Sequence, residues 1–161
     1  MTTTIRALED RDHERVAALS LRAWAPVFAS IERVLGPSGV YAALHPDWRA
    51  SQRRAVQAAL DAADMRVWVA EVDAVVAGFA AAVLHHDESI GEVHMLAVDP
   101  PFQRRGIATA LLDVATTWIK EQGRAVALVG TGGDPGHAPA RRTYEQAGFT
   151  ALPGVQYFRT L

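Results

Sequence analysis

The stretch that decides the fold runs from Leu96 to Thr109 and reads LAVDPPFQRRGIAT. Its first residues end an apolar run of the kind that forms a buried strand, and Asp99-Pro100-Pro101 stops that run. After Gly106, apolar residues recur at helical spacing: Ile107, Leu111, Val114 and Trp118. The stretch therefore predicts a strand, a loop and an amphipathic helix in close succession.

The loop between this strand and this helix has the features of a phosphate-binding turn. It reads Gln103-Arg104-Arg105-Gly106-Ile107-Ala108. The first turn of a helix leaves backbone N–H groups unpaired and carries positive partial charge, which suits a pyrophosphate. Gly106 would let phosphates approach the backbone closely, and the two arginines would add charge. The alternative is an ordinary helix start with two solvated arginines. The loop lacks both the G-x-G-x-x-G of dinucleotide folds and the G-K-[S/T] of a P-loop.

Strand and helix patterns alternate along the rest of the chain. We expect strands over residues 3–7, 65–72, 75–84, 92–98 and 126–129, an edge strand over 155–160, and a turn at Asp73-Ala74. We expect one helix after a cap at Asp10 or Asp12, a second around Val56 to Ala63, and a late one that ends at Gly148. Residues 24–48 contain three prolines and two glycines, so we expect short pieces there. The pattern is that of a mixed α/β protein.

Composition narrows the possible classes of function. The chain has 161 residues and a net charge of -2, which fits a single domain over residues 1–161. Its arginines are scattered, so we expect no nucleic-acid partner. No cysteine is present, which excludes disulfides, thiolate metal sites and a cysteine nucleophile. The longest apolar run is too short to span a bilayer, so we expect a soluble cytoplasmic protein without a membrane partner.

The motifs around Gly106 and near the end of the chain resemble those of one enzyme family. The loop from Gln103 to Ala108 is similar to the Q/R-x-x-G-x-G/A acetyl-coenzyme-A motif of the GNAT superfamily of N-acetyltransferases. The stretch Ala140 to Phe149, with Tyr144 inside it, resembles the family's late helix and its frequent catalytic tyrosine, and the opening Ile5-Arg6 is similar to a common family start. The resemblance implies an α/β (α+β) fold with a mixed central sheet, flanked by helices and splayed open beside the fourth strand.

The same resemblance implies where acetyl-CoA would bind. The pantetheine arm would lie in the splay, and the pyrophosphate would lie on the loop and the helix start. The implied cofactor-binding residues are Leu96, Ala97, Val98, Gln103, Arg104, Arg105, Gly106, Ile107, Ala108, Thr109 and His137. His137 departs from the family pattern, which often has asparagine seven residues before the tyrosine. Either His137 takes over that contact or the arm is held differently.

Three side chains are candidates for the proton transfers of acetyl transfer to an amine. Tyr144 is the candidate general acid, because a tyrosine can reprotonate the departing thiolate. Glu92 and His94 lie on the same side of their strand and either could take the amine's proton; some family members have a glutamate base at the position of Glu92. The alternatives are that Tyr144 packs its helix, that Glu92 is solvated and that His94 is hydrogen-bonded in the core. Without a cysteine, direct attack in a ternary complex is favoured.

The expected function is therefore acetyl-CoA-dependent N-acetylation of a primary amine on a small molecule or peptide. One alternative is a non-catalytic coenzyme-A-binding regulatory domain, and another is an unrelated nucleotide-binding α/β domain. Dimers are frequent in the family, so a homodimer is one expectation. The run His85 to Glu88 lacks a partner cluster with ligand spacing, so we expect no metal site. Four aromatic residues could line an acceptor pocket or pack beneath a long connection: Trp24, Phe28, Tyr41 and Trp48.

Overall fold

The computed structural model describes residues 2–86 and 89–161 and contains helices and strands in the expected mixture. The strands are β1 Thr3–Ala7, β2 Met65–Val72, β3 Val75–Leu84, β4 Ile90–Val98 and β5 Val126–Val129. The α-helices are α1 His13–Leu35, α2 Val40–Leu44, α3 Trp48–Asp61, α4 Ile107–Glu121 and α5 Ala138–Gln146. Single 3-10 turns lie at η1 Asp10–Asp12, η2 Gly36–Ser38, η3 Pro100–Phe102 and η4 Pro135–His137.

The strands of the described residues form one mixed sheet in the order β1-β2-β3-β4-β5. The first four are antiparallel neighbours, whereas β5 pairs with β4 in parallel. Asp73 and Ala74 make the turn between β2 and β3, and both have positive φ, as a tight hairpin requires. The expected fold class, a mixed sheet flanked by helices, is confirmed.

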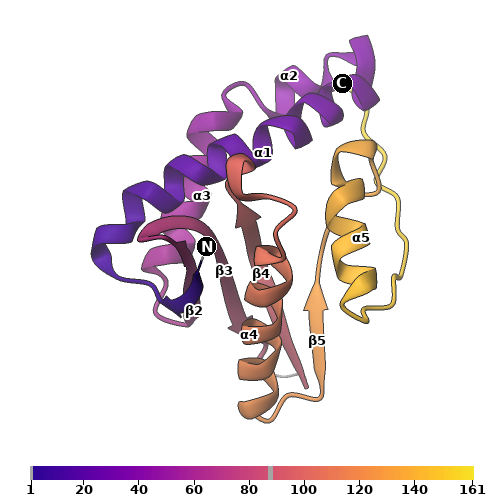
Figure 1. The fold of residues 1–161 in the computed structure, drawn as a ribbon. Helices are drawn as coiled ribbons and strands as arrows, with labels where there is room; N and C mark the ends of the chain where they lie inside the picture. Colours follow the sequence, from indigo (N-terminus) through magenta and orange to yellow (C-terminus); the bar gives the residue numbers. More distant parts are fainter. Residues whose placement is uncertain (1, 87–88) are drawn as a thin grey trace.

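Two apolar layers bury the two faces of this sheet. On one face α4 packs Leu111, Leu112 and Ile119 against β3 and β4. On the other face α1 and α3 contribute Val16, Leu19, Val56 and Leu60. Figure 1 shows α1 and α3 behind and above the sheet and α4 in front of it. Because β3 is covered on both sides, it carries the continuous apolar run that the sequence displays.

The first helix differs from the prediction in its length and in the side-chain bonding at its start. α1 runs for 23 residues and continues through Pro26, where short pieces were expected. Burial of Ser30, beyond the proline, accompanies this continuation. Asp12 is the N-cap residue of α1, at one of the two predicted positions, but its side chain makes no capping hydrogen bond to this helix. The Asp12 carboxylate instead accepts hydrogen bonds from Arg6 at 2.7 and 3.0 Å.

The predicted edge strand over residues 155–160 is wrong. The chain beyond Phe149 forms no helix or strand in the part that the structure describes. Figure 1 shows this tail running from the end of α5 along the side of α5 away from β5, up to the region of α2. A strand needs a neighbouring strand with free backbone groups, and on this path the tail meets none.

Candidate acetyl-transfer cleft

The cleft arises because β4 and β5 separate along their length. Their parallel pairing covers Ile90↔Val126 to Val93↔Val129, whereas β4 continues to Val98 without β5 beside it. Figure 1 shows the two strands diverging toward their carboxyl ends. A β-bulge lies at His94, since Ala81 pairs with Met95 and Ala82 pairs with Val93. Bulges bend a strand and redirect its side chains, so this one contributes to the opening.

A cavity of about 890 Å³ lies in this opening. Its floor is the carboxyl half of β4, from Val93 to Val98, and one wall is the loop and first turn of α4. The opposite wall is α5, with Tyr144 in its last turn and His137 just before its start. Part of α1 with Trp24 and Val27 closes one end. A pocket of this size and mixed lining is typical of a site for a cofactor-sized ligand.

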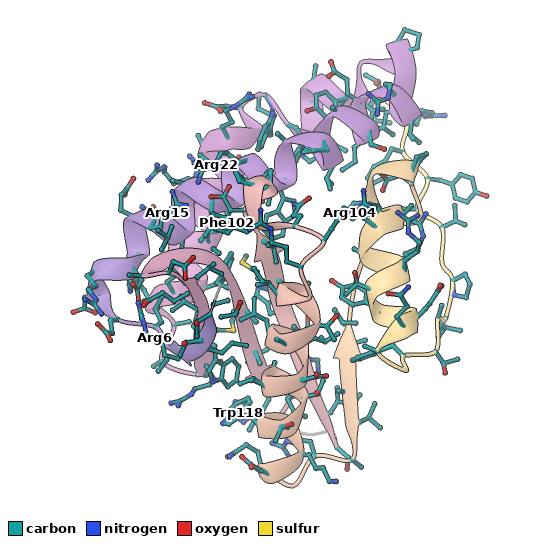
Figure 2. All side chains as sticks on the ribbon, viewed as in Figure 1. Arg6, Arg15, Arg22, Phe102, Arg104 and Trp118 are labelled. Carbon is teal, nitrogen blue, oxygen red and sulfur yellow. The ribbon has the colours of Figure 1, made fainter. Side chains whose placement is uncertain are left out.

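The loop before α4 has a backbone shaped to present N–H groups. Gly106 has φ +79°, and Arg104 has φ +62°, which is costly for a residue with a side chain. Such left-handed positions next to a helix start form a concave nest of N–H groups that suits an anion. A Cβ added to Gly106 would meet no atom within 4 Å, so the turn faces open space. Figure 2 shows the Arg104 side chain between this loop and α5.

A buried carboxylate holds this loop against α1. Asp99 lies directly after β4 and is 2% exposed. Its oxygens accept hydrogen bonds from Arg22 Nε and Nη2, both at 2.8 Å, and from Arg15 Nη2 at 2.9 Å. Figure 2 shows both arginines projecting from α1. Gln103 adds a bond from its side-chain amide to the Val98 carbonyl at 2.9 Å. The position of the loop is therefore tied to both α1 and β4.

His137 is held by a network that crosses from η4 to α1. Its Nδ1 is hydrogen-bonded to Asp134 Oδ1, and Ser30 Oγ donates to Asp134 Oδ2 at 2.7 Å. The Gly136 N–H donates to Ser30 Oγ at 2.8 Å, an approach that a Cβ on Gly136 would block at 2.5 Å from the Ser30 Cβ. Burial raises the pKa of Asp134, but the bonds from Ser30 and His137 outweigh it and leave that pKa below its ordinary value. An ionised Asp134 accepts from Nδ1, which leaves Nε2 for the cleft.

Tyr144 lies on α5 with its ring against the apolar layer of α4 and against Phe149, at a ring distance of 6.2 Å. It lines the cleft. Burial raises the pKa of its hydroxyl above the ordinary value. The hydroxyl is therefore protonated at neutral pH, as a proton donor must be.

The two candidate bases do not lie equally close to the cleft. His94 lines it and is half exposed, whereas Glu92 lies beside it. Glu92 Oε2 is 2.8 Å from His85 Nε2, and Glu92 Oε1 is 3.6 Å from His94 Nδ1. The expectation that Glu92 and His94 share one side of the strand fits this distance. His85, at the end of β3, is a partner that spacing along the chain did not indicate.

The structure brings most of the predicted site residues together. Tyr144, His94 and ten of the eleven predicted cofactor-binding residues line the cleft. Glu92 and Arg105 do not; the Arg105 guanidinium lies 5.7 Å from the centre of the Phe102 ring. Sequence reasoning missed Ser30 and Asp134, which support His137, because they are 104 residues apart in the chain.

The four aromatic residues between positions 24 and 48 divide between the two expected roles, lining a pocket and packing helices together. Trp24 lines the cleft. Phe28 of α1 and Trp48 of α3 stack at a ring distance of 4.5 Å. The rings of Phe28 and Tyr41 each lie 5.2 Å from that of His45, which follows α2, so these aromatic residues pack α1, α2 and α3 together. Of the run His85 to Glu88, Asp87 and Glu88 lie outside the described residues. Among residues 2–86 and 89–161 no three metal-ligating side chains converge, and no helix is long and apolar enough to cross a membrane.

Solved structures with the same fold carry related descriptions. AAC(6')-Iy in complex with the bisubstrate analogue CoA-S-monomethyl-acetylneamine aligns with a TM-score of 0.69 and 21% identity, over 100% of this chain and 99% of that one. A protein from Desulfovibrio desulfuricans, described as a candidate GNAT acetyltransferase, gives 0.68 and 24%, over 94% and 87%. The PaiA N-acetyltransferase of Thermoplasma acidophilum with coenzyme A gives 0.66 and 16%, over 91% and 89%. At these identities the likeness shows the fold.

The sequence itself matches a family model across the cleft. No curated protein sequence matches the chain. The model of the acetyltransferase (GNAT) family matches residues 31–149, which include β4, the loop at Gly106, α4 and α5. The chain therefore belongs to the GNAT family of acetyltransferases.

Proposed function

We propose that this protein transfers an acetyl group from acetyl-CoA to a primary amine of a small molecule or peptide. The observation that carries the proposal is the cleft, in which a loop of left-handed Arg104 and Gly106 faces the half-buried Tyr144 across the splay of β4 and β5. Two structurally similar proteins, AAC(6')-Iy and PaiA, have been solved with coenzyme A or a conjugate of it. A single domain over residues 1–161 would hold the whole site.

The donor is proposed to lie along the cleft with its pyrophosphate on the α4 start. The N–H groups of the first turn and the Arg104 side chain would bind the phosphates. The pantetheine arm would follow β4 from Leu96 to Val98, where β5 no longer occupies the pairing edge. His137 takes the place where the family often has asparagine, and its Nε2 would bond the arm because Nδ1 is engaged by Asp134.

The reaction is proposed to be direct attack within a ternary complex. The amine nitrogen attacks the thioester carbonyl, the nitrogen loses a proton, and the C–S bond breaks as the thiolate leaves. Tyr144 would give its hydroxyl proton to that sulfur, because burial keeps the group protonated. Holding amine and thioester together supplies much of the rate, roughly 7–11 kcal/mol in favourable cases.

His94 is proposed to meet the amine first, with Glu92 behind it. His94 lines the cleft, and Glu92 lies 3.6 Å from its Nδ1. A carboxylate at that distance stabilises a histidine that has gained a proton. In this proposal Glu92 stabilises the protonated His94 or receives its proton, and water could replace His94 between Glu92 and the amine.

The acceptor end of the cleft favours a particular kind of amine. Its α1 side is formed by Ala23, Trp24, Pro26 and Val27, and none of the described residues that line the cleft is a carboxylate. Polycationic acceptors such as the aminoglycosides gain most from acidic side chains. We therefore expect a preference for an acceptor with one amine on a largely apolar body.

A screen for acetyl-CoA-dependent thiol release tests this function. The acceptors should include arylalkylamines, amino acids, polyamines, aminoglycosides and peptide N-termini. Amine-dependent release, lost in Tyr144→Phe, is the expected result. Binding of coenzyme A without turnover for any class would favour the alternative, a non-catalytic coenzyme-A-binding regulatory domain. A preference for ATP or NAD in thermal shift would overturn the donor assignment.

A further inference from the structure

The turn η4 and the glycines around it leave room for one arrangement of the His137 side chain. The His137 imidazole is 20% exposed and lines the cleft, and the Asp134 carboxylate beside it is 12% exposed. A Cβ on Gly132 would lie 2.5 Å from Asp134 Oδ1 and closer still to His137 Nδ1. A Cβ on Gly136 would lie 2.5 Å from the Ser30 Cβ. Glycine at both positions therefore permits the pairing of Asp134 with His137 and the approach of Ser30.

Two helices far apart in the chain fix Asp134 in place. From α1, Ser30 Oγ donates to Asp134 Oδ2 at 2.7 Å, and the Gly136 N–H donates to the same oxygen at 3.0 Å. From α5, Arg141 Nη1 donates to the Asp134 backbone carbonyl at 2.8 Å. Ser30 is 1% exposed, so water has little access to its bond. Oδ2 is thereby committed to two donors, and Oδ1 is left for His137.

This commitment decides which imidazole nitrogen carries the hydrogen when the ring is neutral. Burial alone would raise the pKa of Asp134, but the bonds from Ser30 and His137 leave that pKa below its ordinary value, so the carboxylate is ionised at neutral pH. An ionised carboxylate can only accept, so the hydrogen between Oδ1 and His137 Nδ1 belongs to Nδ1. A neutral imidazole has a single N–H, so Nε2 holds a lone pair and is an acceptor.

We propose that Asp134 and Ser30 are positioning residues that present the bare Nε2 of His137 to the cleft, where it accepts a hydrogen bond from an amide N–H of the pantetheine arm. The inference rests on the proposed function, in which the arm follows β4 from Leu96 to Val98. An arm bonded to the β4 edge on one side can bond the opposite wall on its other side. His137 lies on that wall.

A fixed acceptor makes this wall selective for one kind of group on the ligand. A lone pair on Nε2 attracts an N–H and repels the oxygen of an ester or a carbonyl. Coenzyme A has two amides in its arm, and an analogue in which an ester oxygen replaces one amide nitrogen lacks one N–H. Of the two possible ester analogues, we expect one to bind about tenfold more weakly than coenzyme A, because it leaves Nε2 unpaired in the cleft.

Asp134→Asn should reverse the tautomer while keeping the shape of the side chain. Because Oδ2 accepts from two donors, the asparagine oxygen takes the place of Oδ2 and its amide nitrogen takes the place of Oδ1. That nitrogen donates to His137 Nδ1, so the hydrogen of the ring moves to Nε2, which then faces an N–H as a second donor. We expect the Kd for coenzyme A, measured by calorimetry, to rise about tenfold and the discrimination against the ester analogue to disappear. Asp64→Asn, exposed just before β2, should leave both unchanged.

His137→Gln separates positioning from support of the loop. Glutamine places an amide oxygen near the position of Nε2, and this oxygen accepts whatever residue 134 does. We expect the Kd of this variant to stay within about threefold of the wild type, and Asp134→Asn to add no further loss in its background. An equal loss from Asp134→Asn in both backgrounds would overturn the positioning role, because the network would then only hold the loop.

Nitrogen NMR of the histidine rings gives a readout that needs no cofactor. The His137 signals are those missing from the spectrum of His137→Gln. In mildly alkaline solution, Nε2 should be unprotonated in the wild type and protonated in Asp134→Asn, and coenzyme A should shift the wild-type Nε2 signal. A wild type with the hydrogen on Nε2 would overturn this inference and leave the proposed function standing. A wild type that binds no coenzyme A would overturn both.

Discussion

Replacing Asp99 by asparagine should weaken the attachment of the loop before α4 to α1 and so destabilise this wall of the cleft. The carboxylate is buried and accepts three charged hydrogen bonds from Arg15 and Arg22 of α1. Asparagine has nearly the same shape, but its amide group must face guanidinium donors where an oxygen now accepts. Because Oδ2 accepts two of the three bonds, one amide orientation loses two bonds and the other loses one.

The magnitude follows from these contacts. Hydrogen bonds to charged groups contribute about 1.5–3 kcal/mol each, and removing one partner of a buried pair costs about 3–5 kcal/mol. The arginine side chains are 39% and 45% exposed, so water recovers part of the loss. We expect Asp99→Asn to lower the free energy of unfolding by about 2–4 kcal/mol, or Tm by roughly 5–15 °C for a chain of this length.

Urea unfolding of wild type, Asp99→Asn and the matched variant Asp64→Asn checks this expectation. Asp64 is exposed just before β2, so the same chemical change there should cost little. The KM for acetyl-CoA should rise in Asp99→Asn, since the loop then loses its attachment to α1. A loss below about 1 kcal/mol would refute the reasoning, because surface pairs contribute only that much.

Three further predictions concern the site. Gly106→Glu should abolish coenzyme A binding in calorimetry, whereas Gly123→Glu, at φ +78° and equally open but at the far end of α4, should not; equal binding by both variants would contradict the loop assignment. Tyr144→Phe should lower kcat by about 10²–10⁴-fold. Because burial raises the pKa of Tyr144, the kcat of the wild type should fall only at a pH above the ordinary tyrosine pKa of about 10. If the kcat of Tyr144→Phe falls in the same way at high pH, Tyr144 is not the group responsible. His94→Gln should remove the acidic limb of kcat/KM and Glu92→Gln should shift it, with rescue by an amine of lower pKa; if neither changes the profile, the amine loses its proton in solution.

Local patterns predicted much of the fold. The apolar run Val75 to Leu84 and the turn at Asp73-Ala74 indicated the central hairpin, and the helical spacing from Ile107 to Trp118 indicated α4. These elements depend on neighbours a few residues away, and such neighbours can be read from spacing. The continuation of α1 through Pro26 could not be predicted from local spacing, because proline usually breaks a helix. Ser30, beyond this proline, is held by a contact with Asp134 far along the chain, which local spacing does not reveal.

The amino-acid sequence by itself determined the candidate phosphate loop, the buried strands and the tyrosine-bearing helix, since each is specified by residue types at short spacing. Only the tertiary structure decided which distant side chains meet. Asp99 contacts Arg15 and Arg22 from 84 and 77 residues away, and Asp134 meets Ser30 across 104 residues. It also decided that the strand-like tail lies apart from the sheet, because pairing depends on where a free edge lies in space and not on the strand pattern alone.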